Sequence, residues 1–275
     1  EMPEELAKEL RSSIFMLGPV IGRFKKARFT YPGGCEIGNR PIDLHIKGLR
    51  ELNVDVLEEH GYIICDASAM RGADIHLDYP SVGATENIMM AAIAAPGKPV
   101  IRNAAREPEI WDLQQMLVQM GARIYGAGSS TILIEGGSLL HGVKHRMVPD
   151  RIAAGTWMVA AAITGGDVLV NNVQAEHLHS VLSKLRECGC RLDVTGASVR
   201  VRGPVRPKEM EMIETLPYPG FPTDMQAQFF ALASVADGTS VIMENVFENR
   251  YKHASELSCM GAVSTIKDRM AIVRG

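Results

Sequence analysis

The stretch YPGGCEIGNRPID, from Tyr31 to Asp43, places a cysteine and an arginine close together in a glycine-rich setting. The two glycines before Cys35 permit backbone conformations that are closed to other residues, so the stretch is typical of a loop. A neighbouring cation such as Arg40 makes a thiol more reactive, and its planar fork fits a phosphate or a carboxylate. The pattern predicts a thiol that acts on an anionic ligand. A turn cysteine without a function remains the alternative.

Two helix starts carry the features of an anion site. In RPIDLHIKGL, Pro41 lies at the start of a predicted helix and Asp43 in its first turn. In DYPSVGATEN, the residues Ser81, Val82 and Gly83 follow a strand and open a helix. Backbone N–H groups at a helix start favour an anion such as a diphosphate. Each feature is also common without a ligand, because acidic residues and glycines occur at many helix starts.

The segment YPGFPTDMQAQF, residues 218–229, places Asp224 at a helix start directly before apolar residues. The apolar neighbours predict partial desolvation of the carboxylate, which suits a general base. A simple N-cap is the alternative. Two charged segments, NAAREPEI and ENVFENRYKH, are interpreted as solvated loops with ion pairs.

The composition excludes several classes of protein. The chain has 275 residues, of which 46% are hydrophobic and 22% charged, and its formal net charge is −3. This balance gives no basic field for nucleic acid or for a membrane surface. The longest wholly apolar run, Ile88–Ala95, is too short to span a bilayer. No signal or transit peptide is recognised, so we expect a cytoplasmic location.

The five cysteines are expected to be reduced thiols, because their number is odd and the chain is not small. Cys188 and Cys190 form a C-x-C pair, but no second pair with metal-ligand spacing accompanies it. We interpret the pair as the end of a helix that leads into a strand. No metal and no cofactor are predicted.

The chain repeats itself. A helix end, a glycine, a strand, a polar turn and a second strand recur around Gly121, Gly189 and Gly261, with a fainter copy around Asn53. An apolar helix, a glycine turn and a strand recur in phase with them. The period is about 70 residues, and four copies are visible. The pattern predicts an α/β fold made of helix–strand–helix–strand–strand units, with the apolar helices buried. The helix start at Pro149–Asp150 predicts two domains, residues 1–149 and 150–275.

Six stretches together resemble the UDP-N-acetylglucosamine 1-carboxyvinyltransferases, a branch of the enolpyruvyl transferase family. They are PGGCEIGNRPIDLHIKGL, SVGAT, NAAREPEI, PDRIAAGT, FPTDMQAQF and ENRYKH. The resemblance runs from about Arg11 to Gly275. It implies an inside-out α/β barrel of βαβαββ units in two domains, each incomplete in this chain, because the first and last units of the family are missing. The related 5-enolpyruvylshikimate-3-phosphate synthases lack the cysteine loop.

The resemblance implies transfer of the enolpyruvyl group of phosphoenolpyruvate to the 3′-hydroxyl of UDP-N-acetylglucosamine with release of phosphate, the first committed step of peptidoglycan synthesis. By motif match, Cys35 is the general acid and the target of fosfomycin, and Asp224 is the candidate base. The resemblance assigns substrate binding to Arg11, Arg40, Pro41, Ile42, Asp43, Leu44, Ser81, Val82, Asp224 and Val246, the last through its backbone. It assigns support of the cleft to Glu107, Asp150, Glu248 and Arg250.

Several interpretations remain open. Tyr79 stands where the family often has a lysine, and the loss of this positive charge lowers the expected affinity for the nucleotide. The terminal phosphate-binding residues of the family are absent, so we expect this chain alone to be inactive. It could instead be a truncated, non-catalytic paralogue that binds a UDP-sugar or a partner protein. A cysteine hydrolase would need a histidine on Cys35, and only His45 is near in sequence. Self-association or a complementing fragment could cover the faces that the missing units expose.

Overall fold

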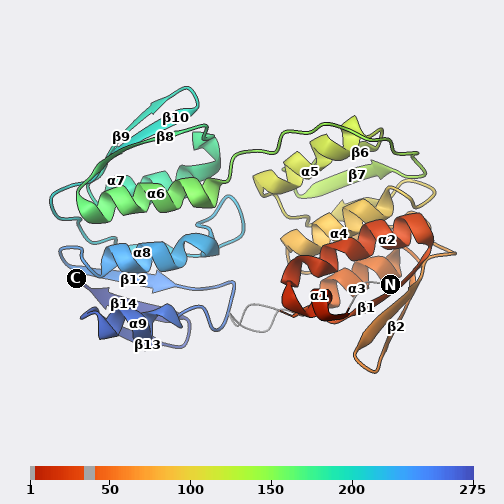
Figure 1. The fold of residues 1–275 in the computed structure, drawn as a ribbon, viewed down its shortest axis with the longest axis horizontal. Coiled ribbons are helices and arrows are strands. Elements are labelled where there is room, and N and C mark those ends of the chain that lie inside the picture. The colour runs from red at the N-terminus through yellow and green to blue at the C-terminus, as the bar shows by residue number, and fades with distance from the viewer. Residues whose placement is uncertain (1–3, 34–40) are drawn as a thin grey trace. The chain divides into compact units, whose positions relative to one another are not determined.

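The computed structural model describes residues 4–33 and 41–275 and contains two compact units. Unit 1 consists of residues 4–33 and 41–148, and unit 2 of residues 149–275. Figure 1 labels their helices and strands where there is room. Cys35 and Arg40 lie outside the described residues.

Unit 1 begins with short helices and continues with alternating strands and helices. Its strands form two open sheets, one of three strands in the order β1-β3-β2 and one of four in the order β4-β5-β7-β6. In chain order its elements are α1 (Glu4–Glu9), the 3-10 helix η1 (Arg11–Met16), α2 (Leu17–Phe24), β1 (Lys26–Thr30), α3 (Asp43–Glu51), β2 (Asp55–Glu59), β3 (Tyr62–Asp66), β4 (Asp74–His76), α4 (Val82–Ala92), β5 (Val100–Arg102), α5 (Pro108–Gln119), β6 (Arg123–Tyr125) and β7 (Thr131–Glu135).

Unit 2 is built in the same way. Its two open sheets have the orders β8-β10-β9 and β11-β12-β14-β13. Its elements are α6 (Arg151–Thr164), β8 (Asp167–Asn171), the 3-10 helix η2 (Ala175–Leu178), α7 (His179–Glu187), β9 (Arg191–Thr195), β10 (Ser198–Arg202), β11 (Met212–Glu214), the 3-10 helix η3 (Thr223–Met225), α8 (Gln226–Ala233), β12 (Thr239–Met243), α9 (His253–Cys259), β13 (Val263–Lys267) and β14 (Met270–Arg274).

The predicted repeat is confirmed by this element order. Helix, strand, helix, strand and strand follow one another four times, and two of the copies, residues 74–135 and 212–274, also contain the preceding strand. In these two complete copies the first two strands pair in parallel and the others antiparallel. All four sheets are open, so closure into a barrel remains a prediction.

Left-handed residues end the helices at the predicted positions. The backbone angle φ is +103° at Gly121, +95° at Gly189 and +99° at Gly261, and Asn53 reaches +62°. Glycine has no Cβ to clash in this conformation, and asparagine tolerates it better than most residues. The repeated glycines therefore mark the turns from helix to strand.

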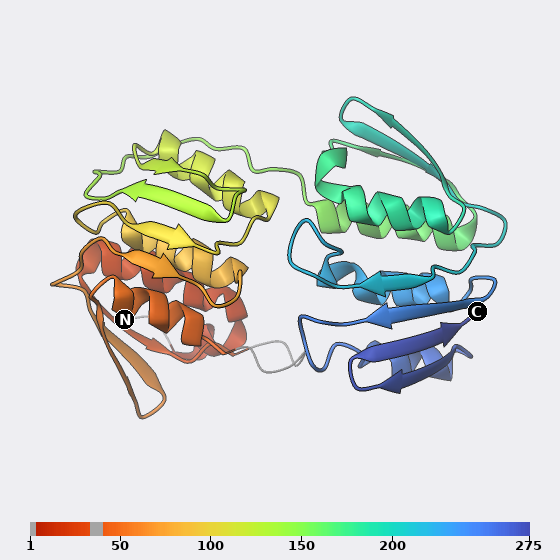
Figure 2. The same ribbon diagram turned by 180° about the vertical axis from the view of Figure 1, so that it is seen from behind.

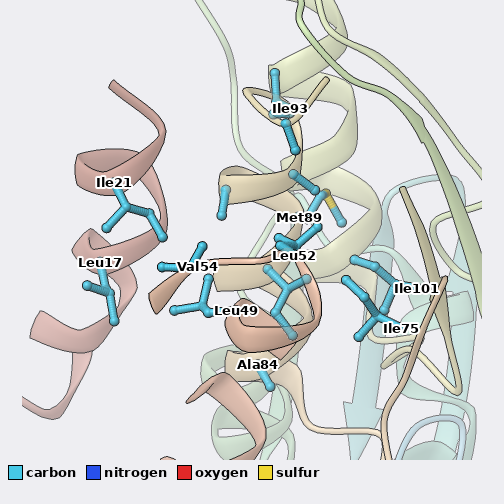
Figure 3. Packing of buried hydrophobic residues seen from close by; sticks show 14 of the residues in the cluster. Leu17, Ile21, Leu49, Leu52, Val54, Ile75, Ala84, Met89, Ile93 and Ile101 are labelled. Atoms are coloured by element: carbon cyan, nitrogen blue, oxygen red, sulfur yellow. The ribbon is translucent and has the colours of Figure 1, made fainter. Parts of the chain in front are cut away.

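Helix α4 forms the centre of the hydrophobic core of unit 1. Ile88 and Met89 on this helix are fully buried. Figure 3 shows Leu17 and Ile21 on one side of the core, with Leu49 and Met89 near its middle. Burial of such a side chain contributes about 1.5–3 kcal/mol. The prediction that the apolar helix is buried is thus confirmed for α4.

Helix α8 occupies the corresponding place in unit 2 and covers one face of the β11-β12-β14-β13 sheet, which Figures 1 and 2 show from its two sides. Phe229 and Phe230 are fully buried, and the Phe229 ring meets Phe221 edge to face at 4.9 Å between centroids. Helix α6 differs from the prediction, because it is buried on one side only and Trp157 is 65% exposed. Among the described segments, no helix is both long and apolar enough to cross a bilayer.

Candidate active site

The predicted anion-binding helix starts of unit 1 are present. Pro41 and Ile42 precede α3, and Asp43 is its first residue. Ser81 is the N-cap of α4, where its hydroxyl accepts a hydrogen bond from the backbone N–H of Ala84 at 3.3 Å. Both helix starts therefore have the predicted local geometry.

His45, in the first turn of α3, connects three elements of unit 1. Its ring contacts Phe15 of η1 with 6.4 Å between ring centroids. A Cβ atom added to Gly83 at the start of α4 would lie 3.2 Å from both Cε1 and Nε2 of the imidazole. Glycine at this position therefore lets α4 approach the ring, and the starts of α3 and α4 and the end of η1 lie together around His45.

The protonation state of His45 follows from a buried asparagine. Asn87 is fully buried, and its Oδ1 accepts a hydrogen bond from the backbone N–H of Gly18 at 2.6 Å. Its Nδ2 donates to the Ile14 carbonyl at 3.1 Å and lies 3.0 Å from Nδ1 of His45. A backbone N–H only donates and a carbonyl only accepts, so each of these two bonds independently determines which end of the Asn87 amide is oxygen and which is nitrogen. Nδ1 of His45 must therefore accept, and the proton of the neutral ring lies on Nε2.

Burial and a neighbouring cation keep this imidazole neutral. Burial, together with the charge of Arg11, lowers the pKa of His45 to about 4, against the opposing effect of Asp43. Arg11 begins η1, so the predicted substrate-binding arginine acts electrostatically on the same ring. His45 is a hydrogen-bond donor through Nε2 at neutral pH. Its conformation depends on Asn87, 42 residues away in the chain, which local sequence reasoning could not connect to it.

A cavity of about 610 Å³ adjoins the start of α3, within the size range of small-ligand sites. Two cations of its wall are engaged within unit 1. Lys47 Nζ lies 2.7 Å from a carboxylate oxygen of Asp78, and Arg50 Nη2 donates to the Val56 carbonyl at 3.0 Å. The wall includes three predicted substrate-binding residues, and its members are Tyr31, Pro41, Ile42, Asp43, Ile46, Lys47, Arg50, Glu51 and Glu58.

Two carboxylates at the start of α5 act on a third on α4. Glu107 is the N-cap of this helix and is 9% exposed, and Glu109 lies in its first turn. Burial, together with the charges of Glu109 and Glu107, raises the pKa of Glu86 on α4 to about 7. The predicted solvated loop is thus only partly correct here, because Glu107 is buried.

In unit 2, Asp224 lies in η3 and is ion-paired. Its carboxylate accepts a hydrogen bond from Nη2 of Arg250 at 2.6 Å, and its side chain is 58% exposed. The predicted desolvation is therefore wrong, because Phe229 and the other apolar residues turn inward on α8 whereas Asp224 precedes that helix. The alternative of an N-cap is also wrong, since Pro222 holds the N-cap position.

Glu244, directly after β12, is a buried carboxylate that the sequence interpretation placed in a solvated loop. It is 1% exposed. Its Oε1 accepts hydrogen bonds from the hydroxyl of Thr215 at 2.8 Å and from the backbone N–H groups of Val246 at 2.9 Å and Phe247 at 3.2 Å. The Thr223 hydroxyl lies 3.0 and 2.9 Å from the two carboxylate oxygens. Ser240 and Ile242 are buried at alternate positions of β12, and this alternation, continued by one step, is the sequence signal that identifies Glu244 as buried.

The remaining predicted residues of unit 2 have local roles. Val246 follows β12 rather than lying in it, and its N–H donates to Glu244, so the predicted backbone contact with a ligand would have to be made by its carbonyl. Asp150 caps α6 by accepting from the N–H groups of Ile152 at 2.8 Å and Ala153 at 3.0 Å. Glu248 pairs with Arg269 at 3.3 Å.

The cysteines described by the structure are free thiols. Cys188 ends α7 and lies 3.7 Å from Cys190 between the sulfur atoms, so the pair joins helix to strand as predicted. Within the residues that the structure describes, no group of three or more histidine, cysteine, aspartate or glutamate side chains could hold a metal ion.

Known proteins match the chain over its whole length. A family model described as EPSP synthase (3-phosphoshikimate 1-carboxyvinyltransferase) matches residues 1–275. UDP-N-acetylglucosamine 1-carboxyvinyltransferase 2 of Caldanaerobacter subterraneus subsp. tengcongensis is 52% identical over 275 residues, which are 100% of this chain and 66% of the relative. UDP-N-acetylglucosamine 1-carboxyvinyltransferase of Geotalea daltonii matches with the same identity and coverage. The chain thus spans 66% of the length of these curated relatives.

Solved structures agree on the fold. The enolpyruvyl transferase NikO from Streptomyces tendae superposes with a TM-score of 0.87 at 21% identity, over 99% of this chain and 65% of that one. EPSP synthase from Acinetobacter baumannii gives a TM-score of 0.67 at 22% identity, over 96% of this chain and 62% of that one. The chain therefore belongs to the EPSP synthase family of enolpyruvyl transferases and has the α/β fold of that family.

Proposed function

We propose that the complete protein transfers the enolpyruvyl group of phosphoenolpyruvate to the 3′-hydroxyl of UDP-N-acetylglucosamine and releases phosphate. The observation that carries this proposal is 52% identity over the whole chain to relatives named UDP-N-acetylglucosamine 1-carboxyvinyltransferase. The segment around Cys35 and Arg40 supports the same branch, because both residues match its loop motif. The reaction needs no metal and no cofactor.

In this proposal, unit 1 binds the sugar nucleotide. The backbone N–H groups at the starts of α3 and α4 and the charge of Arg11 favour a diphosphate. Pro41, Ile42, Asp43 and Leu44 would line the nucleotide pocket at the start of α3, and Ser81 and Val82 at the start of α4. Neutral His45 keeps an uncharged donor at the same place over the physiological pH range.

The chemistry requires one acid and one base. The Cys35 thiol would protonate the methylene carbon of phosphoenolpyruvate while the 3′-hydroxyl attacks the neighbouring carbon, and Asp224 would accept the hydroxyl proton. Loss of phosphate together with a proton from the new methyl group then gives the enolpyruvyl ether. Arg250 supports this role because its ion pair orients the Asp224 carboxylate.

The chain on its own is proposed to be inactive or nearly so, because it covers 66% of its relatives. The test compares two proteins. One is the 275-residue chain, and the other is this chain joined to the parts of the Caldanaerobacter relative that it does not cover, termed the completed protein. We expect phosphate release from both substrates by the completed protein only. Transfer by the chain alone would contradict the proposed inactivity, and a folded completed protein without transfer would contradict the function.

A non-catalytic protein that binds a UDP-sugar is the second candidate. Binding of UDP-N-acetylglucosamine to the 275-residue chain, measured by calorimetry, together with a completed protein that binds but never turns over, would select this candidate. Faces left open by the missing parts would then bind a second copy of the chain or a complementing fragment, and the mass of the species in solution tests for both.

We propose a cytoplasmic location, which the free thiols support.

A further inference from the structure

The carboxylate of Glu244 is buried, and none of the lysines and arginines that the structure describes forms an ion pair with it. The charge is instead held by donors from Thr215, Thr223, Val246 and Phe247. Hydrogen bonds of this kind are strong, because one partner is ionised.

Stability alone does not explain a charge at this position. Removing a carboxylate from water is costly, and well-packed apolar residues often replace buried charged groups without loss of stability. The other complete repeat provides a direct comparison. There Asn103 takes the same place after β5, and its neutral amide donates to the Leu77 carbonyl of the adjacent strand at 2.8 Å. A neutral side chain therefore suffices to join the two strand ends.

The partners of Glu244 show what the charge adds. Thr223 directly precedes Asp224, and Val246 is the other predicted ligand contact of unit 2. Both are held by one carboxylate, although they are far apart in the chain. Arg250 holds the Asp224 side chain from another direction at 2.6 Å. The side chain of Thr223, the residue before Asp224, and the Asp224 carboxylate are thus each held by a hydrogen bond.

We propose that Glu244 is the positioning residue of the transferase site. It holds Asp224 through Thr223, and it holds the Val246 carbonyl through the Phe247 N–H of the same planar peptide group. This inference rests on the proposed function, since it assigns Asp224 and Val246 to the reaction. Glu244 itself does not contact substrate. Its effect is geometric, and misplacement of a reacting group by about 1 Å can cost about 100-fold in rate.

Variants of Thr223 test the link to Asp224. In the completed protein, Thr223→Val removes the hydroxyl that donates to Glu244, whereas Thr223→Ser keeps it. We expect Thr223→Val to lower kcat by about 10- to 100-fold with little change in the KM for the UDP-sugar. We expect Thr223→Ser to stay within about twofold of the unchanged protein. The exposed residue Glu256 on α9 supplies the control, Glu256→Gln, which should change neither value.

A variant of Glu244 tests the second link. Glu244→Gln keeps the shape but removes the charge, and it replaces one of the two oxygens that face Thr223 by an NH2 donor. The hydrogen bonds to Thr223, Val246 and Phe247 then lose an ionised acceptor and weaken. We expect the variant to lower kcat and also to raise KM, because Thr223 and the Val246–Phe247 backbone are held less firmly. Hydrogen exchange of the Val246 and Phe247 amides in the 275-residue chain should become faster, while exchange elsewhere in unit 2 stays unchanged.

The outcomes separate this inference from the proposed function. If the completed protein catalyses transfer and folded Thr223→Val matches it in kcat, the positioning role is wrong. The same holds if Thr223→Ser loses as much activity as Thr223→Val, or if a lower fraction of folded protein accounts for the whole loss. If the completed protein without any substitution has no activity, the proposed function fails. The role of Glu244 can still be tested in that case, because amide exchange in Glu244→Gln that equals exchange in the original chain would refute it. If Glu244→Gln does not fold, the two Thr223 variants decide.

Discussion

The two complete repeats, residues 74–135 and 212–274, have the same backbone and different side chains where chemistry is expected. In each repeat, the residue after the first strand donates its N–H to the last residue of the second strand: Leu77 to Arg102 at 3.1 Å, and Thr215 to Met243 at 3.0 Å. The sheet orders also correspond. The fold therefore depends on backbone pairing and on buried apolar faces that both repeats share.

The two repeats differ in the side chains at two consecutive positions, which are Ser81 and Val82 in the first repeat and Thr223 and Asp224 in the second. In the first repeat, Ser81 follows a proline and caps α4. In the second, Thr223 also follows a proline, but its hydroxyl bonds to Glu244 instead of capping a helix. Asp224 then takes the place of Val82. The comparison teaches that one scaffold carries a neutral helix start in one copy and a carboxylate site in the other.

The largest effect is expected from Asp224→Asn in the completed protein. The amide keeps the size of the side chain but cannot accept the proton of the substrate hydroxyl. We expect kcat to fall roughly 10²- to 10⁴-fold, the usual contribution of a general base. Rate measurements over a range of pH would check this. Because Asp224 is exposed, the free energy of unfolding should change little, and a kcat within about threefold of the original would remove Asp224 from the role of base.

The two cores should respond separately to the loss of a large side chain. Phe229→Ala on α8 should lower the stability of unit 2 by about 3–5 kcal/mol, and Ile88→Ala on α4 that of unit 1 by about 2–5 kcal/mol, because both side chains are fully buried.

The two tryptophans provide the measurement, since Trp111 lies in unit 1 and Trp157 in unit 2. Urea unfolding of single-tryptophan variants, Trp111→Phe and Trp157→Phe, would report each unit. Equal shifts of both signals by either core variant would show that the units unfold together.

The sequence was sufficient for features that depend on local pattern. It predicted the repeat, the left-handed helix ends at Gly121 and Asn53, and the helix starts at Asp43 and Asp150, because each depends on a few neighbouring residues. The fold of the family followed from its motifs.

Features that depend on distant contacts could not be predicted in this way. The neutral state of His45 requires Asn87, whose orientation in turn requires Gly18. Glu244 was assigned to solvent because it begins a charged cluster, although the alternation of β12 continues to it. Asp224 was expected to be desolvated by its sequence neighbours, yet they turn into the core of unit 2. In each case the three-dimensional surroundings outweighed the local composition.

A carboxyl group of unit 1 predicts a pH dependence that unit 2 should lack. Burial, with Glu109 and Glu107, raises the pKa of Glu86 from 4.5 to about 7. Between these values the folded state binds more protons than the unfolded state, so the stability of unit 1 falls as pH rises through this window. We expect Glu86→Gln to stabilise unit 1 by about 1–3 kcal/mol at pH 8, with little effect near pH 4.

The signal of Trp111 in urea unfolding at several pH values would measure this effect. His45 acts in the opposite direction, because its pKa is lowered from 6.5 to about 4 and its contribution to stability rises with pH. Only the difference between variant and unchanged chain therefore isolates Glu86. The exposed residue Glu9 supplies the control, Glu9→Gln, and an equal gain at pH 4 and pH 8 would contradict burial of the Glu86 carboxyl group as the cause.

The smallest effect concerns the hydroxyl that caps α4. Ser81→Ala removes the acceptor for the Ala84 N–H and should lower the stability of unit 1 by about 1 kcal/mol. Ser81→Asp should retain it, because aspartate also caps helices well. In unit 2, Thr223→Ala should leave the start of α8 with its existing N–H partners, since the Thr223 hydroxyl bonds to Glu244 and not to that helix. Amide exchange in the first turns of α4 and α8 would compare the variants directly. If Thr223→Ala speeds exchange at the start of α8 as much as Ser81→Ala speeds it at the start of α4, the hydroxyl stabilises the helix start in both repeats. The two repeats would then differ only in Glu244 and Asp224.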